Sequence, residues 1–145
     1  MAMITLEALI DRIRQYNKNG DLSIVEKAYA YATEKHKGQL RKSGEPYITH
    51  PVNVAYILAD LELDAQSICA ALLHDVVEDT PVTHEDLINE FGETIDMLVD
   101  GVTKLNKIPY TTKEEQQIEN LRKMFFAMAK DVRVIVIKLA DRLHN

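Results

Sequence analysis

The sequence predicts an all-α domain, a single bundle of helices without a sheet. Apolar residues recur every three or four positions through most of the chain, which is the spacing of one helical face. Capping residues and helix-stopping Gly or Pro residues bound these segments. Only residues 132–137 have the β-branched composition of a strand, and we find no second segment with which such a strand would pair. With 145 residues, the chain is long enough for one domain with its own core.

Two helices are expected in the first quarter of the chain. The first covers residues 5–17 and ends in a sequence rich in Asn and Gly. The second covers residues 23–37, where Ser23 and Glu26 form a capping box at the start and Gly38 follows the end. Start and stop signals therefore agree with the helical periodicity.

The middle of the chain predicts four further helices. Residues 39–50 contain Gly and Pro breakers and are expected to be irregular, and the proline that begins the next helix, 51–61, suits its first turn. Asp64 then caps a helix that is apolar on most of its surface, so we expect it to be buried. Two shorter helices are expected at residues 83–90 and 92–102.

The last third of the chain begins with a predicted polar loop at residues 104–111 and a long helix at residues 112–130. The β-branched segment 132–137 favours a strand by propensity alone. Because an isolated strand cannot satisfy its backbone, we predict a buried helix with Asp131 as its cap. Its polar sides carry Lys138, Asp141, Arg142 and Asn145.

Composition excludes several classes of protein. Hydrophobic residues make up 46% and charged residues 28% of the chain, which is typical of a globular and not of a disordered protein. The net charge of -6 argues against general nucleic-acid binding, which needs a basic face. The single cysteine, Cys69, allows no disulfide within the chain, so we expect a buried thiol in a reducing cytoplasm. The sequence favours neither secretion nor membrane binding.

The most informative sequence is 74–79, which closes the apolar helix. It places one imidazole and three carboxylates, His74, Asp75, Glu78 and Asp79, at a helix C-terminus. Exposed anions there oppose the helix dipole by roughly 0.3–1 kcal/mol each, and burying an unpaired carboxylate costs several kcal/mol more. A cation would remove both penalties, so a metal site is the first hypothesis. Glu78, one turn after His74, and Asp79 would orient or deprotonate a water molecule.

Further ligands must come from other segments, because His74 and Asp75 point about 100° apart on a helix. His50 lies immediately before a proline at a helix start, and Asp141 lies late in the last helix. Two imidazoles and two carboxylates without a thiolate suit manganese, iron or zinc. Each residue also has an ordinary alternative: Asp141 could simply pair with Arg142, for example. Their combination in one helical chain favours metal binding.

The order and spacing of these four residues resemble those of the HD-domain metal phosphohydrolases. Longer sequences at 38–51, 72–80, 100–105 and 138–145 resemble the N-terminal hydrolase domain of the Rel/SpoT alarmone synthetase/hydrolase family. The similarity runs over residues 23–145. It implies the HD-domain helical bundle and hydrolysis of the 3′-pyrophosphate of guanosine tetra- and pentaphosphate, giving GDP or GTP and pyrophosphate.

By this resemblance, the site residues take specific roles. The manganese ligands would be His50, His74, Asp75 and Asp141. Glu78 and Asp79 match an acidic pair that handles the attacking water and its proton. The substrate-binding residues would be Arg41, Lys42, Ser43 and Asn145. Arg41 and Lys42 would also supply the local positive charge that an acidic domain needs in order to bind a nucleotide.

Some alternatives stay open. Because every motif position is intact, an active enzyme is favoured over a catalytically silent domain that senses the alarmone. An HD phosphohydrolase acting on another nucleotide is the second alternative. The family usually continues into a synthetase domain, so we expect this chain to be one hydrolase domain, 1–145, of a longer protein. His36 and His84 are expected at the surface, and His144 has no assigned role.

Overall fold

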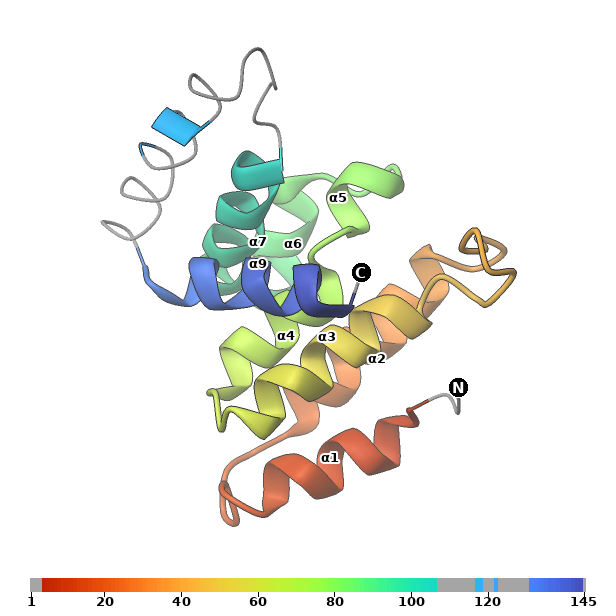
Figure 1. The fold of residues 1–145 in the computed structure, drawn as a ribbon. Coiled ribbons are helices and arrows are strands. Elements are labelled where there is room, and N and C mark those ends of the chain that lie inside the picture. Colours follow the sequence, from red (N-terminus) through yellow and green to blue (C-terminus); the bar gives the residue numbers. More distant parts are fainter. Residues whose placement is uncertain (1–3, 107–116, 119–121, 123–130, 145) are drawn as a thin grey trace.

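The computed structural model describes residues 4–106, 117–118, 122 and 131–144. Over these ranges the chain is helical, as predicted, and its only β-type pairing is an isolated bridge between Leu40 and Pro46 (Figure 1). The helices are α1 (Leu6–Arg14), α2 (Ser23–Lys35), α3 (Thr49–Asp60), α4 (Ala65–Leu73), α5 (Val76–Asp79), α6 (His84–Phe91), α7 (Glu93–Asn106) and α9 (Arg133–His144).

The starts of the first two helices differ in how they are capped. Thr5 caps α1, because its hydroxyl accepts a hydrogen bond from the amide of Ala8 at 3.1 Å. The capping box predicted at Ser23 is wrong, since Ser23 is already the first residue of α2 and its amide donates to the Asp21 carboxylate at 2.9 Å. The carboxylate of Asp21 therefore accepts a hydrogen bond from a free amide at the start of α2, which is the capping role that the sequence assigned to Ser23.

The predicted helix through the acidic sequence is divided into two. Helix α4 ends at Leu73 with His74 as its C-cap, and α5 starts at Val76 with Asp75 as its N-cap. The amide of Asp79 donates to the carbonyl of Asp75 at 2.9 Å and closes the short second helix. His74 and Asp75 are thus located at a bend between two helices, and their side chains do not belong to one continuous helical face.

The later helices largely follow the prediction. Thr83 and Asp86 form a capping box at the start of α6. Helix α7 is longer than expected and includes Lys104, which the sequence placed in a loop. Residues 105–106 of that loop also belong to α7, whereas residues 107–111 and most of the predicted helix 112–130 lie outside the described residues. The β-branched segment is helical in α9, and the Asp131 carboxylate accepts the Arg133 amide at 2.9 Å, as a cap does.

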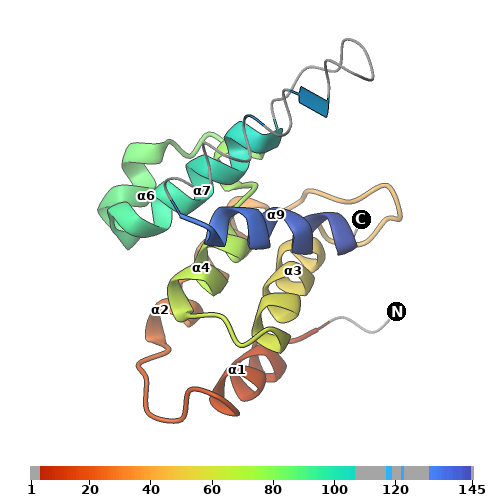
Figure 2. The same ribbon diagram turned by 60° about the vertical axis from the view of Figure 1, so that its left-hand side comes forward.

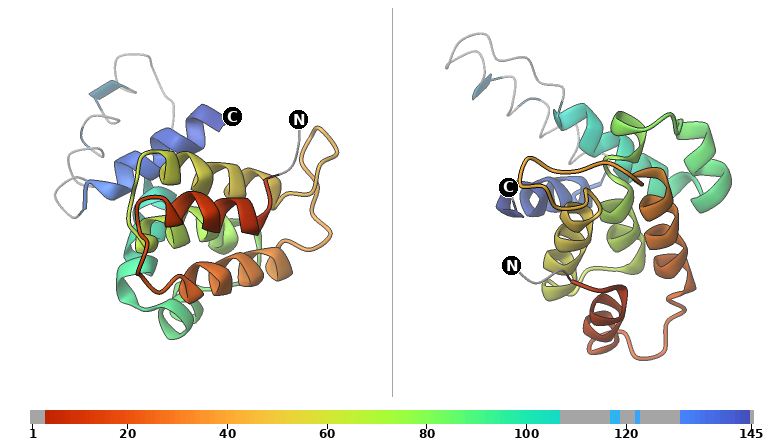
Figure 3. Two further views of the ribbon diagram at one scale, coloured as in Figure 1. Left: turned by 90° about the horizontal axis from the view of Figure 1, so that it is seen from below. Right: turned by 90° about the vertical axis from the view of Figure 1, so that its right-hand side faces the viewer.

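The buried helix α4 forms the centre of the core. Every residue from Ser67 to Leu73 is buried, including the Cys69 thiol, whose pKa burial raises to about 12. Helices α2, α3 and α7 pack around α4, and α1 lies against α3 (Figure 3). None of the helices within the described ranges is long and apolar enough to cross a membrane.

Helix α9 crosses the bundle and brings the end of the described chain over α3, α4 and α7 (Figure 2). Its close approach to α7 depends on Gly101, because a Cβ atom there would lie 2.7 Å from Cγ2 of Val134. The crossing places the late residues of α9 beside the start of α3 and the junction of α4 with α5.

Candidate metal centre

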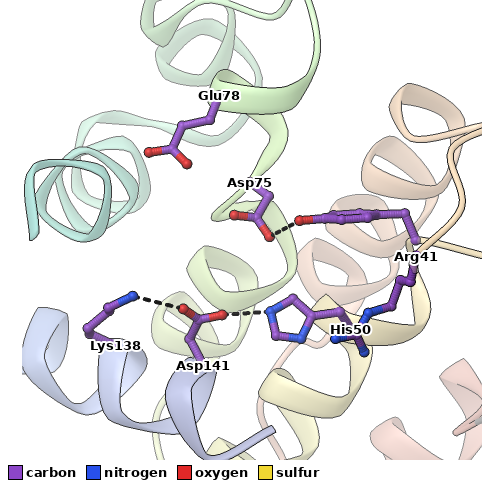
Figure 4. Close-up of a pocket in the computed structure, with 7 residues that line it drawn as sticks. Arg41, His50, Asp75, Glu78, Lys138 and Asp141 are labelled. Atoms are coloured by element: carbon purple, nitrogen blue, oxygen red, sulfur yellow. Dashed lines mark hydrogen bonds and ion pairs between the residues drawn. The ribbon is translucent and has the colours of Figure 1, made fainter. Parts of the chain in front are cut away.

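A cavity of about 290 Å³ opens where four separate segments meet. These segments are the 39–47 turn, the start of α3, the α4–α5 junction and the second half of α9. In Figure 4, Asp141 faces His50 across the cavity, and Glu78 extends from α5 toward the same space. The lining residues are Arg41, Tyr47, His50, Asp75, Glu78, Lys138 and Asp141.

His50, His74 and Asp141 form the only group of three metal-ligating side chains found in the described part of the chain. Each offers one ligand atom, and these atoms lie within 4.8 Å of one another. The Asp141 Oδ1 atom lies 2.6 Å from Nε2 of His50 and 3.2 Å from Nε2 of His74. All three residues are buried. Two imidazole nitrogens and a carboxylate oxygen are a donor set that divalent manganese, iron and zinc accept.

Asp75 stands next to this group. Its Oδ2 atom lies 3.0 Å from Nε2 of His74 and accepts a hydrogen bond of 2.7 Å from the hydroxyl of Tyr47. The bend between α4 and α5 turns the carboxylate back toward the histidine, although the two residues are adjacent in sequence. The four residues predicted as ligands are therefore neighbours in space, and metal ligation by them stays a prediction.

Local structure explains how the imidazoles are aimed. The Nδ1 atom of His74 lies 2.6 Å from the carbonyl oxygen of Ala71, one helical turn earlier. A hydrogen on Nδ1 donated to this carbonyl leaves the lone pair of Nε2 facing the carboxylates, which is the usual arrangement of a metal-ligating histidine. Lys138 precedes Asp141 by one turn and donates to its Oδ2 at 3.1 Å, which leaves Oδ1 for the histidines.

The electrostatics of the group favour a positive charge among the carboxylates. Burial opposes ionisation of His74, but hydrogen bonds with Asp141 and Asp75 outweigh burial and raise its pKa to about 10. Burial likewise opposes ionisation of Asp75 and Asp141, but the neighbouring imidazoles hold both pKa values below the ordinary range. A proton on His74 or a divalent cation can supply this charge, so the residues present fit a metal ion.

Only some of the other predicted site residues line the cavity. Arg41 and Glu78 line it, whereas Asp79, Lys42 and Ser43 are not among its lining residues. The backbone carbonyl of Asp79 nevertheless accepts a hydrogen bond of 2.9 Å from the Gln39 side chain, which fastens α5 to the 39–47 turn. Asn145 lies outside the described residues.

Three side chains at the cavity had no predicted role. Tyr47 and Lys138 each bond an aspartate of the group, and His144 lies against His50 with ring centroids 5.0 Å apart. Burial and the nearby charges of His50 and Arg41 lower the pKa of His144. The helical spacing of Lys138, three residues before Asp141, was a usable signal.

The expectation for His36 was wrong. Its ring is buried under the ring of Tyr47, with centroids 4.8 Å apart, because the 39–47 turn folds back over the end of α2. His84 is half-buried and forms an ion pair with Asp96 at 2.7 Å, so it is not a freely solvated surface residue.

Comparison with known proteins agrees with this geometry. Residues 28–145 match the model of the HD domain family. The chain belongs to the HD domain family. The matched region contains every residue of the cavity. The resemblance to the Rel/SpoT family is also confirmed by individual relatives.

One relative is the bifunctional (p)ppGpp synthase/hydrolase SpoT of Escherichia coli K12, which is 51% identical over 143 residues, or 99% of this chain and 20% of the relative. A guanosine-3′,5′-bis(diphosphate) 3′-pyrophosphohydrolase of Haemophilus influenzae is 59% identical over 114 residues, or 79% of this chain and 17% of the relative. The chain thus spans about a fifth of the length of the curated relatives it matches.

A solved structure extends the comparison to the fold. It is that of a metazoan ortholog of SpoT described as hydrolysing ppGpp, with a TM-score of 0.65 and 35% sequence identity. The match covers 85% of this chain and 68% of the metazoan chain. The helical arrangement described above is therefore shared with a SpoT ortholog.

Proposed function

We propose that this chain hydrolyses the 3′-pyrophosphate of guanosine tetra- and pentaphosphate in a reaction that depends on manganese. The observation that carries the proposal is the buried group of His50, His74 and Asp141 beside a cavity with cationic side chains. The names of the Haemophilus and Escherichia relatives, and the activity of the metazoan ortholog, support this choice of substrate.

His50, His74, Asp75 and Asp141 would hold the ion. When bound, a divalent cation would polarise the phosphoryl oxygens and make water a stronger nucleophile near neutral pH. Manganese is proposed over a soft metal because the donor set contains imidazoles and carboxylates but no thiolate.

The chain's own residues account for the movement of the proton. In the hydrolysis, water oxygen bonds to the phosphorus attached to the 3′ oxygen, and the bond between that phosphorus and the 3′ oxygen breaks. The products are pyrophosphate and a nucleotide whose 3′ oxygen takes up a proton to become a hydroxyl. Glu78 lines the cavity, which supports assigning to it the acceptance of the proton of the water. Asp79 is not among the residues that line the cavity, so we assign it to holding α5 in place through its carbonyl and not to the proton transfer itself.

Two cations on different segments match the charge of the substrate. Arg41 lies in the 39–47 turn and Lys138 in α9, so the nucleotide would meet positive charge from two sides of the cavity. Because the whole chain carries a net charge of -6, binding of an anion depends on these local charges and on the cation. Arg41 can in addition stack its planar guanidinium on the guanine base.

The test is pyrophosphate release from guanosine tetraphosphate by the full chain with added Mn²⁺. We expect turnover by the unchanged chain and a loss of more than about 100-fold in Asp75→Asn, because a ligand matters more than its supporting partners do. Asp96→Asn is the matched control, since Asp96 is also a buried aspartate bonded to a histidine but lies outside the cavity. It should retain the activity of the unchanged chain.

The same assay separates the alternatives. Turnover of dGTP or NADPH in preference to guanosine tetraphosphate would replace the proposed substrate with another nucleotide. Binding of guanosine tetraphosphate without turnover in Mn²⁺ would indicate a sensing domain. We also propose that the chain acts as the hydrolase domain of a longer protein with a synthetase domain, which the length and the bifunctional name of the Escherichia relative support.

A further inference from the structure

His144, in the last turn of α9, contacts a proposed metal ligand through a ring nitrogen. Its Nδ1 atom lies 2.7 Å from Nδ1 of His50, and the two rings are stacked with an interplanar angle of 26°. The other ring nitrogen of His50, Nε2, faces Asp141. His50 thus has one partner at each ring nitrogen, His144 at Nδ1 and Asp141 at Nε2. Of these two partners, only Asp141 belongs to the proposed metal-binding group.

Arg41 identifies the donor and the acceptor in this contact. Its Nη1 atom lies 3.4 Å from the same Nδ1 atom of His144. A guanidinium group has only N–H donors and no acceptor. The Nδ1 atom of His144 must therefore present its lone pair, and the hydrogen of the neutral His144 ring is on Nε2.

The tautomer of His50 follows from that of His144. Because Nδ1 of His144 presents a lone pair, Nδ1 of His50 must carry the hydrogen that it donates across 2.7 Å. Nε2 of His50 lies 2.6 Å from the Asp141 carboxylate, which only accepts hydrogen bonds, so without an ion a hydrogen stands between these two atoms. A metal ion bound through Nε2 would take the place of that hydrogen, and the hydrogen on Nδ1 would stay. In the reverse arrangement, an N–H of His144 would point at an N–H of Arg41, and a neutral His50 ring would keep its hydrogen on Nε2, the nitrogen that the ion needs.

We propose that His144 is a positioning residue that fixes the ligating tautomer and ring orientation of His50 and ties Arg41 to the same point. For His50 it takes the part that the Ala71 carbonyl takes for His74. The proposal rests on the metal-binding part of the proposed function but not on the identity of the nucleotide. It also connects the substrate-facing turn to the metal group through one imidazole.

Three substitutions distinguish this role from simple packing. Asn places its amide oxygen close to the position of the imidazole Nδ1, whereas Gln places its oxygen closer to the position of Nε2, and Leu offers no acceptor. We expect His144→Leu and His144→Gln to weaken Mn²⁺ binding by about 10- to 100-fold, as loss of the partner of a ligating histidine does. His144→Asn should bind Mn²⁺ nearly as well as the unchanged chain.

The measurement is calorimetric titration of each variant of the 145-residue chain with Mn²⁺ alone, without nucleotide. His84→Leu is the control, because it removes a half-buried histidine outside the cavity and should leave the affinity unchanged. The second readout is the imidazole ¹⁵N NMR spectrum of the chain loaded with diamagnetic Zn²⁺. We expect the hydrogen on Nδ1 in His50 and on Nε2 in His144.

Each result decides between the proposals. Unchanged Mn²⁺ affinity in His144→Leu, equal losses in His144→Asn and His144→Leu, or a hydrogen on Nδ1 of His144 would overturn the positioning role. A chain that binds Mn²⁺ with the expected order of variants but does not hydrolyse guanosine tetraphosphate would overturn the proposed substrate and leave the role of His144 supported. A chain that binds no Mn²⁺ would overturn both.

Discussion

Among the described residues, two clusters contain histidine next to aspartate, and one of them is a candidate metal centre. The site cluster consists of His50, His74, Asp75 and Asp141. The α6–α7 cluster consists of His84, Asp96 and Asp100, in which the histidine lies 2.7 Å from one carboxylate and 3.5 Å from the other. The contact distances within the two clusters are therefore similar.

Their environments differ. The side chain of His74 is fully buried, whereas that of His84 is 37% exposed. Lys104 pairs with Asp100 at 2.9 Å, so a protein cation already neutralises part of the α6–α7 cluster. In the site cluster, three ligand atoms from three helices converge within 4.8 Å, and this arrangement is not repeated elsewhere in the described residues.

Proximity of histidine and aspartate is thus a poor indicator of a metal site. Neighbouring helices of one hairpin produce such proximity at the surface, where water and lysine satisfy the charges. A metal site requires convergence of distant segments in a place from which water is largely excluded, because there the charges have no other partner.

The largest effect is expected from Asp141, the aspartate that contacts both histidines proposed as ligands. Asp141→Asn should lower Mn²⁺ affinity by more than about 100-fold, because it removes a ligand charge and not only a supporting contact. Asp96→Asn should keep the Mn²⁺ affinity of the unchanged chain while weakening the contact with His84. Calorimetric titration measures both variants. Equal losses of Mn²⁺ affinity would mean that the two clusters are not functionally distinct.

The pH dependence of stability should also identify the site cluster. The pKa of His74 is raised from 6.5 to about 10, so with a chelator its contribution to stability is complete below pH 6.5 and is lost as the pH rises toward 10. The pKa values of Asp75 and Asp141 are lowered from 3.8, so their contribution is present above pH 3.8 and is lost in acid.

Manganese should reverse the first of these trends. Mn²⁺ must displace the proton of His74, so its affinity should rise by about tenfold for each pH unit until His74 loses its proton. Thermal unfolding between pH 6 and pH 9, with Mn²⁺ and with chelator, measures both trends. Stabilisation by Mn²⁺ that does not increase with pH would show that His74 is not a ligand.

A smaller effect is expected from two tyrosines with equal hydrogen bonds. Tyr47 donates to Asp75 and Tyr16 donates to the Leu63 carbonyl, each at 2.7 Å. Tyr47→Phe should weaken Mn²⁺ binding by about 10- to 100-fold, because the hydroxyl orients a ligand. Tyr16→Phe should cost about 1 kcal/mol of unfolding free energy and leave Mn²⁺ binding unchanged. Titration and chemical denaturation of both variants provide the comparison.

The role of Tyr47 illustrates what the sequence could not predict. Periodicity and capping residues predicted most of the helices, because these signals are local. The bend at His74 and Asp75 was missed, since the apolar pattern continues through it and the reason for it lies in contacts with other segments. The same is true of His36, which becomes buried only when the 39–47 turn packs over it.

For the candidate site, the sequence named the four residues that converge but not the residues that orient them. His50, His74, Asp75 and Asp141 were recognisable by residue type and order. The groups that contact them are the side chains of Tyr47, Lys138 and His144 and the backbone carbonyl of Ala71, and these groups form no recognisable motif in the sequence. Tyr47 and His144 reach the site from distant segments, so their contacts become visible only in the folded chain. Lys138 and the Ala71 carbonyl lie within one helical turn of the residues they contact, so only these two could be inferred from spacing.

The crossing itself can be tested at Gly101. Gly101→Ala places a methyl group 2.7 Å from the stiff side chain of Val134, so α9 must move away from α7. We expect a loss of about 1–3 kcal/mol from overpacking, reduced by about 1 kcal/mol because alanine favours the helix. Mn²⁺ affinity should fall with it, because α9 carries Asp141. Denaturation and titration measure the two losses, and Val134→Ala in the same chain should restore both.

The smallest effect is expected at the solvent-facing side of the α6–α7 cluster. Lys104 is 62% exposed and forms an i,i+4 pair with Asp100, so Lys104→Met should cost no more than about 0.5 kcal/mol. Its Mn²⁺ affinity should equal that of the unchanged chain, because no contact of this pair reaches the cavity. Chemical denaturation and titration test both statements. A change in Mn²⁺ affinity would show that α7 transmits the charge state of one cluster to the other, and the two regions would then have to be treated as one coupled site.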